Sequence, residues 1–171
     1  METTASTHTA VDPAERARQT FADLDRHDLS RADEYWGPDT IDHFLPVGVY
    51  QGTEAIRRYF EELFAACPDF RIEVERIVAE GATSVVQWHA TGTFNGAPFL
   101  GIEPTGRRTD MRGVDIIDWD DDGRIKHNTI YYDGAEFARQ VGMLPPRDSM
   151  GDRALTTMFN GATKLRQRLR R

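Results

Sequence analysis

Apolar residues in the N-terminal part of the chain recur at the three- and four-residue spacing of amphipathic helices. Asp12 can cap the free amides of a helix over residues 12–27, with Glu15 completing a capping box. A second stripe predicts a helix that begins after Thr53 and ends before Pro68. The apolar positions of the two stripes are Ala17, Phe21 and Leu24, and then Ala55, Ile56, Tyr59, Phe60, Leu63 and Phe64.

The segment between these two helices predicts a short helix followed by a short strand. Ser30 opens the helix, which carries Trp36 and stops at Gly37-Pro38, because glycine and proline interrupt helical structure. The stretch TIDHFLP follows and is typical of a strand, on which His43 lies.

From Phe70 onward the period of the apolar positions changes to two, which predicts strands. They are expected at about 70–78, 84–94, 108–119 and 124–132, with the last two joined by the turn DDDG. Helices followed by a meander of strands indicate an α+β fold, a curved and mostly antiparallel sheet with the helices packed on one face.

The two ends of the chain differ from the main domain, expected over residues 12–145. Residues 1–11 are expected to be disordered, and a helix from Ala135 to Val141 closes the domain. Residues 146–171 form a C-terminal extension whose apolar stripe and Arg-rich end predict an amphipathic basic helix. Either this helix docks with its basic end in solvent, or the basic end binds an acidic surface.

Composition excludes several classes of protein. The chain has 171 residues, enough for one domain with a sizeable core. A formal charge of −7 argues against a nucleic-acid surface, and a single cysteine, Cys67, leaves no intramolecular disulfide. Neither a secretory leader nor a membrane span is evident, so we expect a soluble, cytoplasmic protein whose partner is a small molecule or another protein.

Three stretches resemble a known family. GTEAIRRYFEELFAACPDFRIEVERIVAEG, TGTFNGAPFLGIEPTGRR and DGRI...YYDGAEFARQVG are similar to the SnoaL-like polyketide cyclases, within the nuclear transport factor 2 and steroid delta-isomerase superfamily. The resemblance runs from about residue 14 to 144. It implies a cone-shaped sheet closed by helices around a deep pocket, and a homodimer through the outer sheet face. Because the shared signatures form turns, the resemblance implies the fold more firmly than the reaction.

The strand VVQWHATGTF has one polar face and one aromatic face. The resemblance implies that Gln87, His89 and Thr91 line the pocket, while Trp88, Ala90 and Phe94 face a second subunit. Alternatively, Gln87 and His89 satisfy each other within the core, since buried polar groups need partners.

Asp115 is the first candidate for chemistry in the pocket. The alternation of GVDIIDW places it on one face with Met111, Ile117 and Trp119, so its carboxyl group should be hard to ionise. The resemblance to the steroid isomerases, in which a carboxylic acid stays protonated, implies that Asp115 donates a hydrogen bond to a developing oxyanion. Alternatively, it is an ordinary carboxylate that accepts hydrogen bonds from Gln87 or Tyr132.

His43 is the second candidate, because it aligns with the catalytic base of the isomerases and an imidazole exchanges protons near neutral pH. The alternative is that His43 is a core residue whose ring nitrogens have hydrogen-bond partners within the protein. His89 is a further candidate acid or base, with Gln87, Asn128 and Tyr132 as groups that orient a substrate.

Other positions depart from the mechanisms known in the superfamily. Ile130 stands where the cyclases carry a catalytic aspartate. The Arg-Asp-Asp set of the limonene-epoxide hydrolases reads Gln87, His89 and Ile130, and the oxyanion tyrosine of the isomerases falls near Thr20. This chain therefore lacks at least one catalytic residue of each of these three mechanisms.

Two acidic motifs are assigned to local structure. Asp133 with Glu136 three residues later is a capping box, and DWDDDG is a hairpin turn, since Thr129 replaces the glutamate that closes a calcium loop. No ligand pair has zinc spacing, so no metal or other cofactor is expected.

The sequence favours a cofactor-independent enzyme that isomerises, cyclises or dehydrates an apolar, enolisable molecule such as a polyketide-like intermediate. The alternative is a non-catalytic small-molecule-binding or assembly domain, and an epoxide hydrolase is the third choice. Four apolar residues should line the pocket besides the polar candidates, and these are Trp36, Phe60, Trp119 and Ile130.

Overall fold

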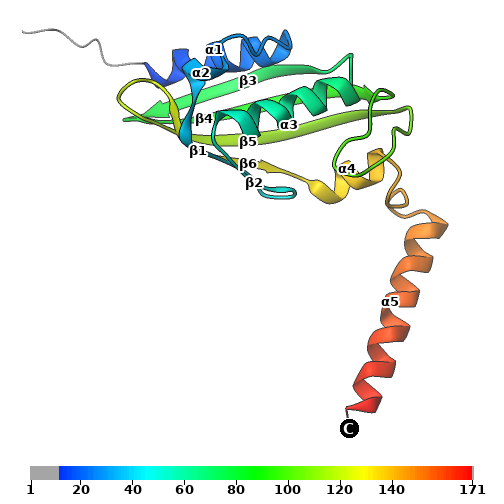
Figure 1. Ribbon diagram of the computed structural model, residues 1–171. Helices are drawn as coiled ribbons and strands as arrows, with labels where there is room; N and C mark the ends of the chain where they lie inside the picture. The colour runs from blue at the N-terminus through cyan, green and yellow to red at the C-terminus, as the bar shows by residue number, and fades with distance from the viewer. Residues whose placement is uncertain (1–11, 171) are drawn as a thin grey trace, which may run out of the picture.

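A curved six-stranded sheet with helices against its concave face forms the body of the molecule, and a long helix extends away from it (Figure 1). The structure is a computed structural model and describes residues 12–170; the disorder expected for residues 1–11 lies outside this range. The helices are α1 (Pro13–Asp25), α2 (Ala32–Tyr35), α3 (Thr53–Ala66), α4 (Gly134–Gln140) and α5 (Met150–Leu169). The strands are β1 (Trp36–Phe44), β2 (Gly48–Gln51), β3 (Arg71–Glu80), β4 (Thr83–Phe94), β5 (Arg107–Trp119) and β6 (Ile125–Tyr132).

The helices begin where the sequence provides a capping side chain. Asp12 Oδ1 accepts a hydrogen bond from the Ala14 amide at 2.9 Å, and Asp133 Oδ1 accepts one from the Glu136 amide at 2.9 Å. The N-cap roles predicted for both aspartates are therefore confirmed. Helix α3 begins at Thr53 itself, whose hydroxyl donates to the Trp36 carbonyl at 2.8 Å and ties the helix to β1.

The strands are arranged in the order β2-β1-β6-β5-β4-β3, and every neighbouring pair is antiparallel except β1 with β6. The sheet is curved and remains open. Helix α1 packs on β3 and β4 while α3 packs on β1 and β2, so the two helices cover opposite parts of the concave face. The predicted α+β architecture is thus confirmed, and the space between helices and sheet becomes available for a pocket.

The sequence interpretation was wrong at the start of the sheet. Trp36 begins β1 and does not end a helix, and Gly37 and Pro38 lie within the strand at an irregularity of its pairing with β6. The Thr40 hydroxyl bridges this irregularity, because it accepts from the Gly37 amide at 2.8 Å and donates to the Ile125 carbonyl. The sequence analysis also missed the short strand β2, which pairs with the end of β1.

A glycine on β5 gives the neighbouring indole room to lie across the sheet. A Cβ atom at Gly113 would stand 2.2 Å from Cζ2 of Trp88, which is its partner on β4. Any larger residue would displace the indole. Gly113 therefore fixes the position of Trp88 on the concave face.

The acidic turn between β5 and β6 is the predicted hairpin connection. Asp120 Oδ1 accepts hydrogen bonds from the amides of Asp122 and Arg124, and Gly123 has a positive φ of 76°. Within residues 12–170, no helix combines the length and apolar character that a membrane crossing requires.

Candidate small-molecule pocket

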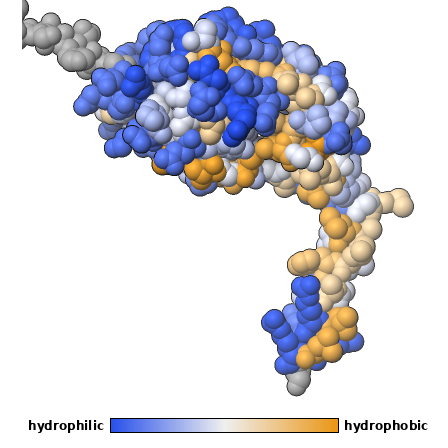
Figure 2. All heavy atoms as spheres, in the orientation of Figure 1, coloured by the Kyte–Doolittle hydropathy of each residue, from blue (hydrophilic) through white to orange (hydrophobic). Residues whose placement is uncertain are grey.

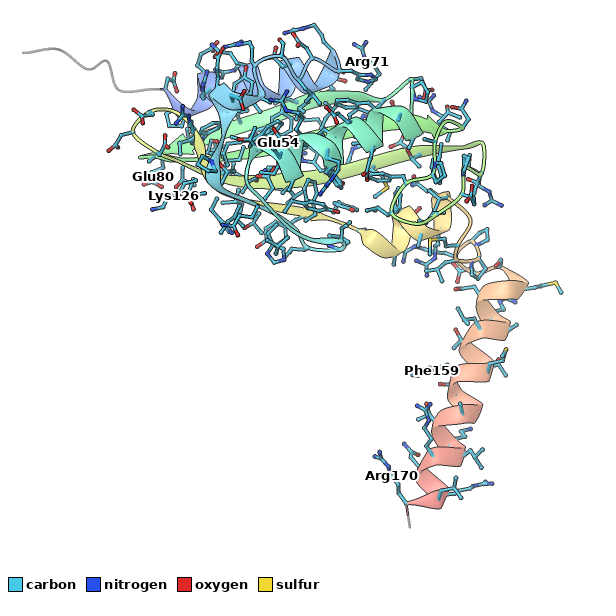
Figure 3. The ribbon with its side chains drawn as sticks, viewed as in Figure 1. Glu54, Arg71, Glu80, Lys126, Phe159 and Arg170 are labelled. Atoms are coloured by element: carbon cyan, nitrogen blue, oxygen red, sulfur yellow. The ribbon has the colours of Figure 1, made fainter. Side chains whose placement is uncertain are left out.

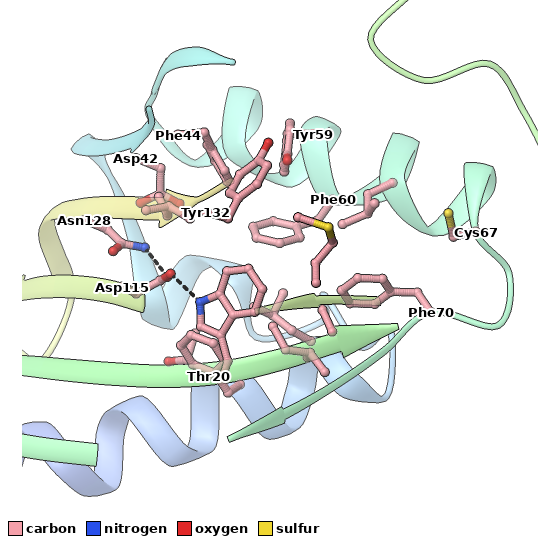
Figure 4. A pocket seen from close by; sticks show the side chains of 18 of the residues that line it. Thr20, Asp42, Phe44, Tyr59, Phe60, Cys67, Phe70, Asp115, Asn128 and Tyr132 are labelled. Carbon is pink, nitrogen blue, oxygen red and sulfur yellow. Dashed lines mark hydrogen bonds between the residues drawn. The ribbon is translucent and has the colours of Figure 1, made fainter. Parts of the chain in front are cut away.

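A cavity of about 130 Å³ lies between the concave face of the sheet and the helices that cover it (Figure 4). Its wall is mostly aromatic and aliphatic, and most of the polar groups that reach it lie on the neighbouring strands β1, β6 and β5. The cavity is far larger than the space that one water molecule occupies. Such an apolar hollow with a few converging polar groups is typical of a small-molecule site.

Asp115 lies at the centre of the polar group. Its Oδ1 accepts a hydrogen bond from the Trp88 indole at 2.7 Å, and its Oδ2 accepts one from the Asn128 amide at 2.9 Å. Both donors are neutral, and the three residues come from the adjacent strands β4, β5 and β6. The alternative partners Gln87 and Tyr132 do not make these bonds.

Burial of Asp115 raises the pKa of its carboxyl group to about 6, because a charged group loses its hydration there. The hydrogen bonds from Asn128 and Trp88 act in the opposite direction, since they stabilise the anion. The acid is therefore harder to ionise than usual, as the alternation of β5 predicts, yet it is largely anionic at neutral pH.

Asp42 is a second carboxyl group in the same pocket. It is 1% exposed and stands opposite Asn128 in the parallel pairing of β1 with β6. Its Oδ1 has no hydrogen-bond partner among the described residues. Burial, and then the charge of Asp115, raise the pKa of Asp42 well above its ordinary value. Asp42 is thus the member of the pair that keeps its proton.

Two tyrosines add hydroxyl groups to the same side of the pocket. Tyr59 comes from α3 and Tyr132 from the end of β6, and both line the cavity (Figure 4). Burial raises the pKa of Tyr132 to about 12. Burial also raises the pKa of Tyr59 well above its ordinary value, and Tyr132, Asp115 and Asp42 are close enough to add to this effect. Both hydroxyls are therefore neutral hydrogen-bond donors at physiological pH.

The rest of the wall is shaped by packed aromatic rings. Trp36 and Phe60 stack with ring centroids 5.5 Å apart, and Phe44 packs against Tyr59 with centroids 4.2 Å apart. Rings of this kind offer flat apolar surfaces for a ligand with fused or conjugated rings.

No lysine, arginine or histidine is among the described residues that line the cavity. The described part of the chain also holds no group of three His, Cys, Asp or Glu side chains arranged for a metal ion. The pocket can therefore offer a ligand one carboxylate, one neutral acid and several neutral donors, but no side-chain cation.

The structure brings six of the predicted site residues to the cavity. Asp115, Asn128 and Tyr132 supply polar groups, and the remaining three supply apolar wall. These wall residues are Trp36, Phe60 and Ile130.

Gln87, His89 and Thr91 lie on the opposite face of the sheet, so the expectation that they line the pocket was wrong. Gln87 donates to Glu75 at 2.7 Å, and His89 Nε2 lies 2.8 Å from an oxygen of Asp110. Trp88 and Ala90, which were expected to face a second subunit, line the cavity instead. Phe94, which was expected beside them on the outer face, also lines it. The physical reason is that the pocket wall is apolar, so the face with the indole turns inward and the polar face turns to solvent.

His43 and Trp119 also lie outside the pocket wall. His43 is half-buried and alternates with Asp42 and Phe44, both of which line the cavity. Trp119 is buried on the concave face, where its indole donates to the Ser84 hydroxyl at 2.9 Å. The structure therefore does not bring His43 and His89 together with Asp115.

Sequence reasoning missed Asp42 and Tyr59 as functional candidates. The signal for Asp42 was present, because in IDHF it shares the parity of the large apolar residue Phe44. Tyr59 was recognised only as part of the apolar stripe of α3. Its hydroxyl could be assigned to the pocket only once the position of α3 over the sheet was known.

The fold and the site define an α+β protein with a curved, open sheet and a largely apolar pocket between the sheet and its helices. The model of the SnoaL-like polyketide cyclase family matches residues 15–141. The chain therefore belongs to the SnoaL-like polyketide cyclases. No curated protein matches it in sequence.

Solved structures of the same fold come from several bacteria. A proposed SnoaL-like polyketide cyclase from Jannaschia sp. CCS1 shares 23% identity, with a TM-score of 0.68 over 85% of this chain and 99% of that one. AclR from Streptomyces galilaeus, a proposed hydroxylase, shares 23% identity and has a TM-score of 0.66 over 94% and 99%. IdmH from Streptomyces antibioticus, a proposed polyketide cyclase, shares 24% identity and has a TM-score of 0.65 over 77% and 99%.

Proposed function

We propose that this protein is a cofactor-independent enzyme that encloses an apolar, enolisable carbonyl compound, such as a polyketide-like intermediate, and isomerises or cyclises it. The observation that supports this most is the pair of buried carboxyl groups at one side of an apolar cavity. Asp115 has two hydrogen-bond donors and Asp42 has none for its Oδ1. Environments that give two neighbouring acids different pKa values are typical of general acid–base sites.

Asp115 acts as the base in this proposal. Its carboxylate removes a proton from the carbon next to the substrate carbonyl, and the electrons of the broken C–H bond form a C=C bond while charge moves to the carbonyl oxygen. Trp88 and Asn128 hold the carboxylate in place and remain neutral throughout. General-base catalysis of this kind contributes roughly a hundredfold to ten-thousandfold in rate.

Asp42 acts as the acid, aided by the hydroxyls of Tyr59 and Tyr132. Asp42 donates a hydrogen bond or its proton to the oxygen that gains charge, which lowers the energy of the enolate. In an isomerisation, Asp115 returns the proton to a different carbon and Asp42 recovers its own. In a cyclisation, the nucleophilic carbon attacks a second carbonyl of the same molecule, and the π electrons of that carbonyl move to its oxygen. This oxygen takes up the proton that Asp115 removed, while the first carbonyl re-forms and Asp42 recovers its own proton. The catalytic roles predicted for His43 and His89 have no part in this scheme.

A non-catalytic binding domain is the alternative, and Ile130 favours it. This residue lines the pocket where the cyclases that the sequence resembles carry a catalytic aspartate. In that case the polar groups only orient a ligand.

The partner expected for the outer sheet face is a second copy of the chain. Val85, Ile116 and Tyr131 leave apolar side chains exposed there, on β4, β5 and β6. Exposed apolar groups of this kind support the homodimer that the sequence resemblance implies.

The test is exchange of substrate protons with solvent. Hydrophobic ketones with enolisable protons are incubated with the protein in D₂O, and deuterium uptake is followed by NMR. We expect Asp115→Asn to lose roughly a hundredfold or more of the exchange rate. Asp110→Asn is the matched control, because this acid lies on the same strand but is exposed on the other face. Equal rates in wild type and Asp115→Asn, with ligand still bound, would support the binding-domain alternative.

A further inference from the structure

Helix α5 carries an apolar stripe that is exposed, because the other described residues of the chain do not cover it. The helix leaves the domain after α4 and extends into open space, and its Phe159 and Arg170 are far from the sheet (Figures 1 and 3). The side chains of the stripe are 48% to 78% exposed. They are Leu155, Met158, Phe159, Leu165 and Leu169. Figure 2 shows hydrophobic and hydrophilic residues side by side at the end of this helix. Because the rest of the domain does not bury the stripe, another molecule must cover it if it is to leave water.

Four residues of the stripe, together with Ala162, have the spacing of a helix–helix seam. Leu155, Met158, Ala162, Leu165 and Leu169 follow one another at intervals of three, four, three and four residues. This heptad spacing lets one helix pack along another. Ala162 and the neighbouring Gly161 are small and have open surroundings, so two backbones can approach at the middle of the seam.

Charge is distributed unevenly along α5. Asp148, Asp152 and Arg153 lie at its start, and Asp152 already pairs with Arg139 of α4 at 3.9 Å. Its last turns carry the basic residues Lys164, Arg166 and Arg168. The chain as a whole is acidic, with a formal charge of −7. Two parallel copies of α5 would place basic end beside basic end and repel. Two antiparallel copies would place each basic end beside the start of the other, where the charges balance and Asp152 offers a carboxylate.

We propose that α5 pairs in an antiparallel manner with the α5 of a second copy of this chain. In the register that sets Leu155 against Leu165 of the second copy, the small Ala162 faces Met158 and Asp152 comes beside Arg166. This contact is distinct from the outer sheet face, so a chain that uses both would form assemblies larger than a dimer. The proposal does not depend on the proposed reaction.

The first test measures the mass of the full chain in solution. Replacing two stripe residues, Met158→Lys with Leu165→Lys, should halve the mass measured by analytical ultracentrifugation. The matched control adds the same charge on the other face of the helix, with Thr157→Lys and Asn160→Lys, and should keep the wild-type mass. All four positions are exposed, so the domain should fold in both variants, which circular dichroism checks. Equal masses for all three proteins would overturn the proposal.

The second test determines the direction of pairing by disulfide cross-linking. A mixture of Leu155→Cys and Leu165→Cys proteins should give a cross-linked species that neither protein gives alone. Cross-linking of Leu155→Cys with itself would show parallel pairing and contradict the proposal. Native Cys67 adds little background, because it is buried and burial raises the pKa of its thiol to about 11.

The last arm separates a second copy from a lipid surface, since basic amphipathic helices also bind anionic membranes. The wild-type chain is mixed with vesicles of phosphatidylcholine and phosphatidylserine and sedimented. We expect it to stay in the supernatant. Binding to these vesicles that both stripe substitutions abolish, without any change of mass in solution, would overturn the proposal in favour of a membrane contact.

Discussion

Two aspartates on β5, five residues apart, show how differently the two faces of the sheet treat the same side chain. Asp110 points outward, where it contacts His89 at 2.8 Å and Arg112 at 3.5 Å. Asp115 points inward and accepts hydrogen bonds from the neutral donors of Trp88 and Asn128. Solvent and cations stabilise the outer carboxylate, whereas burial disfavours the inner one. Of these two acids, the one with the raised pKa therefore lies on the concave face.

The largest effect on stability should come from the pH dependence of the inner acids. Their pKa values are raised in the folded state, so their contribution to stability is complete below the unfolded value near 3.8 and is lost as pH rises. For Asp115 this loss ends at about pH 6, and for Asp42 it continues beyond. Each group in this window costs up to about 1.4 kcal/mol per pH unit.

Asp42→Asn removes one of these titrations without changing the shape of the side chain. The free energy of unfolding, measured by urea denaturation from pH 4 to pH 8, should fall less steeply with pH in this variant than in wild type. Other carboxyl groups cancel in the comparison. Asp110→Asn is the control on the outer face and should keep the wild-type slope. Parallel curves for wild type and Asp42→Asn would show that Asp42 is not the proton-retaining member of the pair.

How much of this contrast could be predicted from the sequence depends on the strand. On β5 the inward face was predicted correctly, because Asp115 shares its parity with Met111, Ile117 and Trp119. On β4 the alternation was recognised but the faces were reversed. Period two defines two faces and does not say which one is inside.

The positions of the large apolar residues could have shown which face of β4 and of β1 is buried. Trp88 shares its face with Val86 and Phe94, and all three are buried. The same rule selects Asp42 over His43, since Phe44 shares its parity. Polarity was taken as the mark of a pocket, whereas the wall of this pocket is apolar and holds only a few polar groups. The short strand β2 gave no signal, because four residues are too few for a period.

The next effect in size concerns the glycine that positions Trp88. Gly113→Ala would place a methyl group 2.2 Å from Cζ2 of Trp88 and 2.6 Å from the Tyr131 carbonyl. The indole would have to move, which weakens its hydrogen bond to Asp115. We expect a loss of about 1–3 kcal/mol in the free energy of unfolding, the range typical of overpacking. Gly37→Ala on β1 is the control, because a Cβ there would meet Arg124 Cδ at 3.6 Å, an ordinary van der Waals distance. If Gly113→Ala is as stable as wild type, the close approach does not constrain the indole.

A smaller effect is expected from the charge of the ligand. Among residues 12–170, no side-chain cation lines the cavity, and Asp115 is largely anionic at neutral pH. A neutral aromatic ketone should therefore bind at least about tenfold more tightly than the matching carboxylate, which corresponds to about 1.4 kcal/mol. Isothermal titration calorimetry at pH 7.5 measures this difference. In Asp115→Asn the preference should decrease, since one repulsive charge is removed, and an unchanged preference would assign the selectivity to another group.

The smallest effect should come from the outer face itself. His89→Ala removes the contact with Asp110, and Gln87→Ala removes the hydrogen bond to Glu75. Both carboxylates stay near Arg112, whose side chain lies 3.3 Å from Glu75 and 3.5 Å from Asp110. Exposed pairs of this kind contribute little, so each variant should change the free energy of unfolding by no more than about 1 kcal/mol and leave proton exchange at the wild-type rate. A large loss of exchange in His89→Ala would show that the outer face takes part in the chemistry, and it would remove the distinction between Asp110 and Asp115.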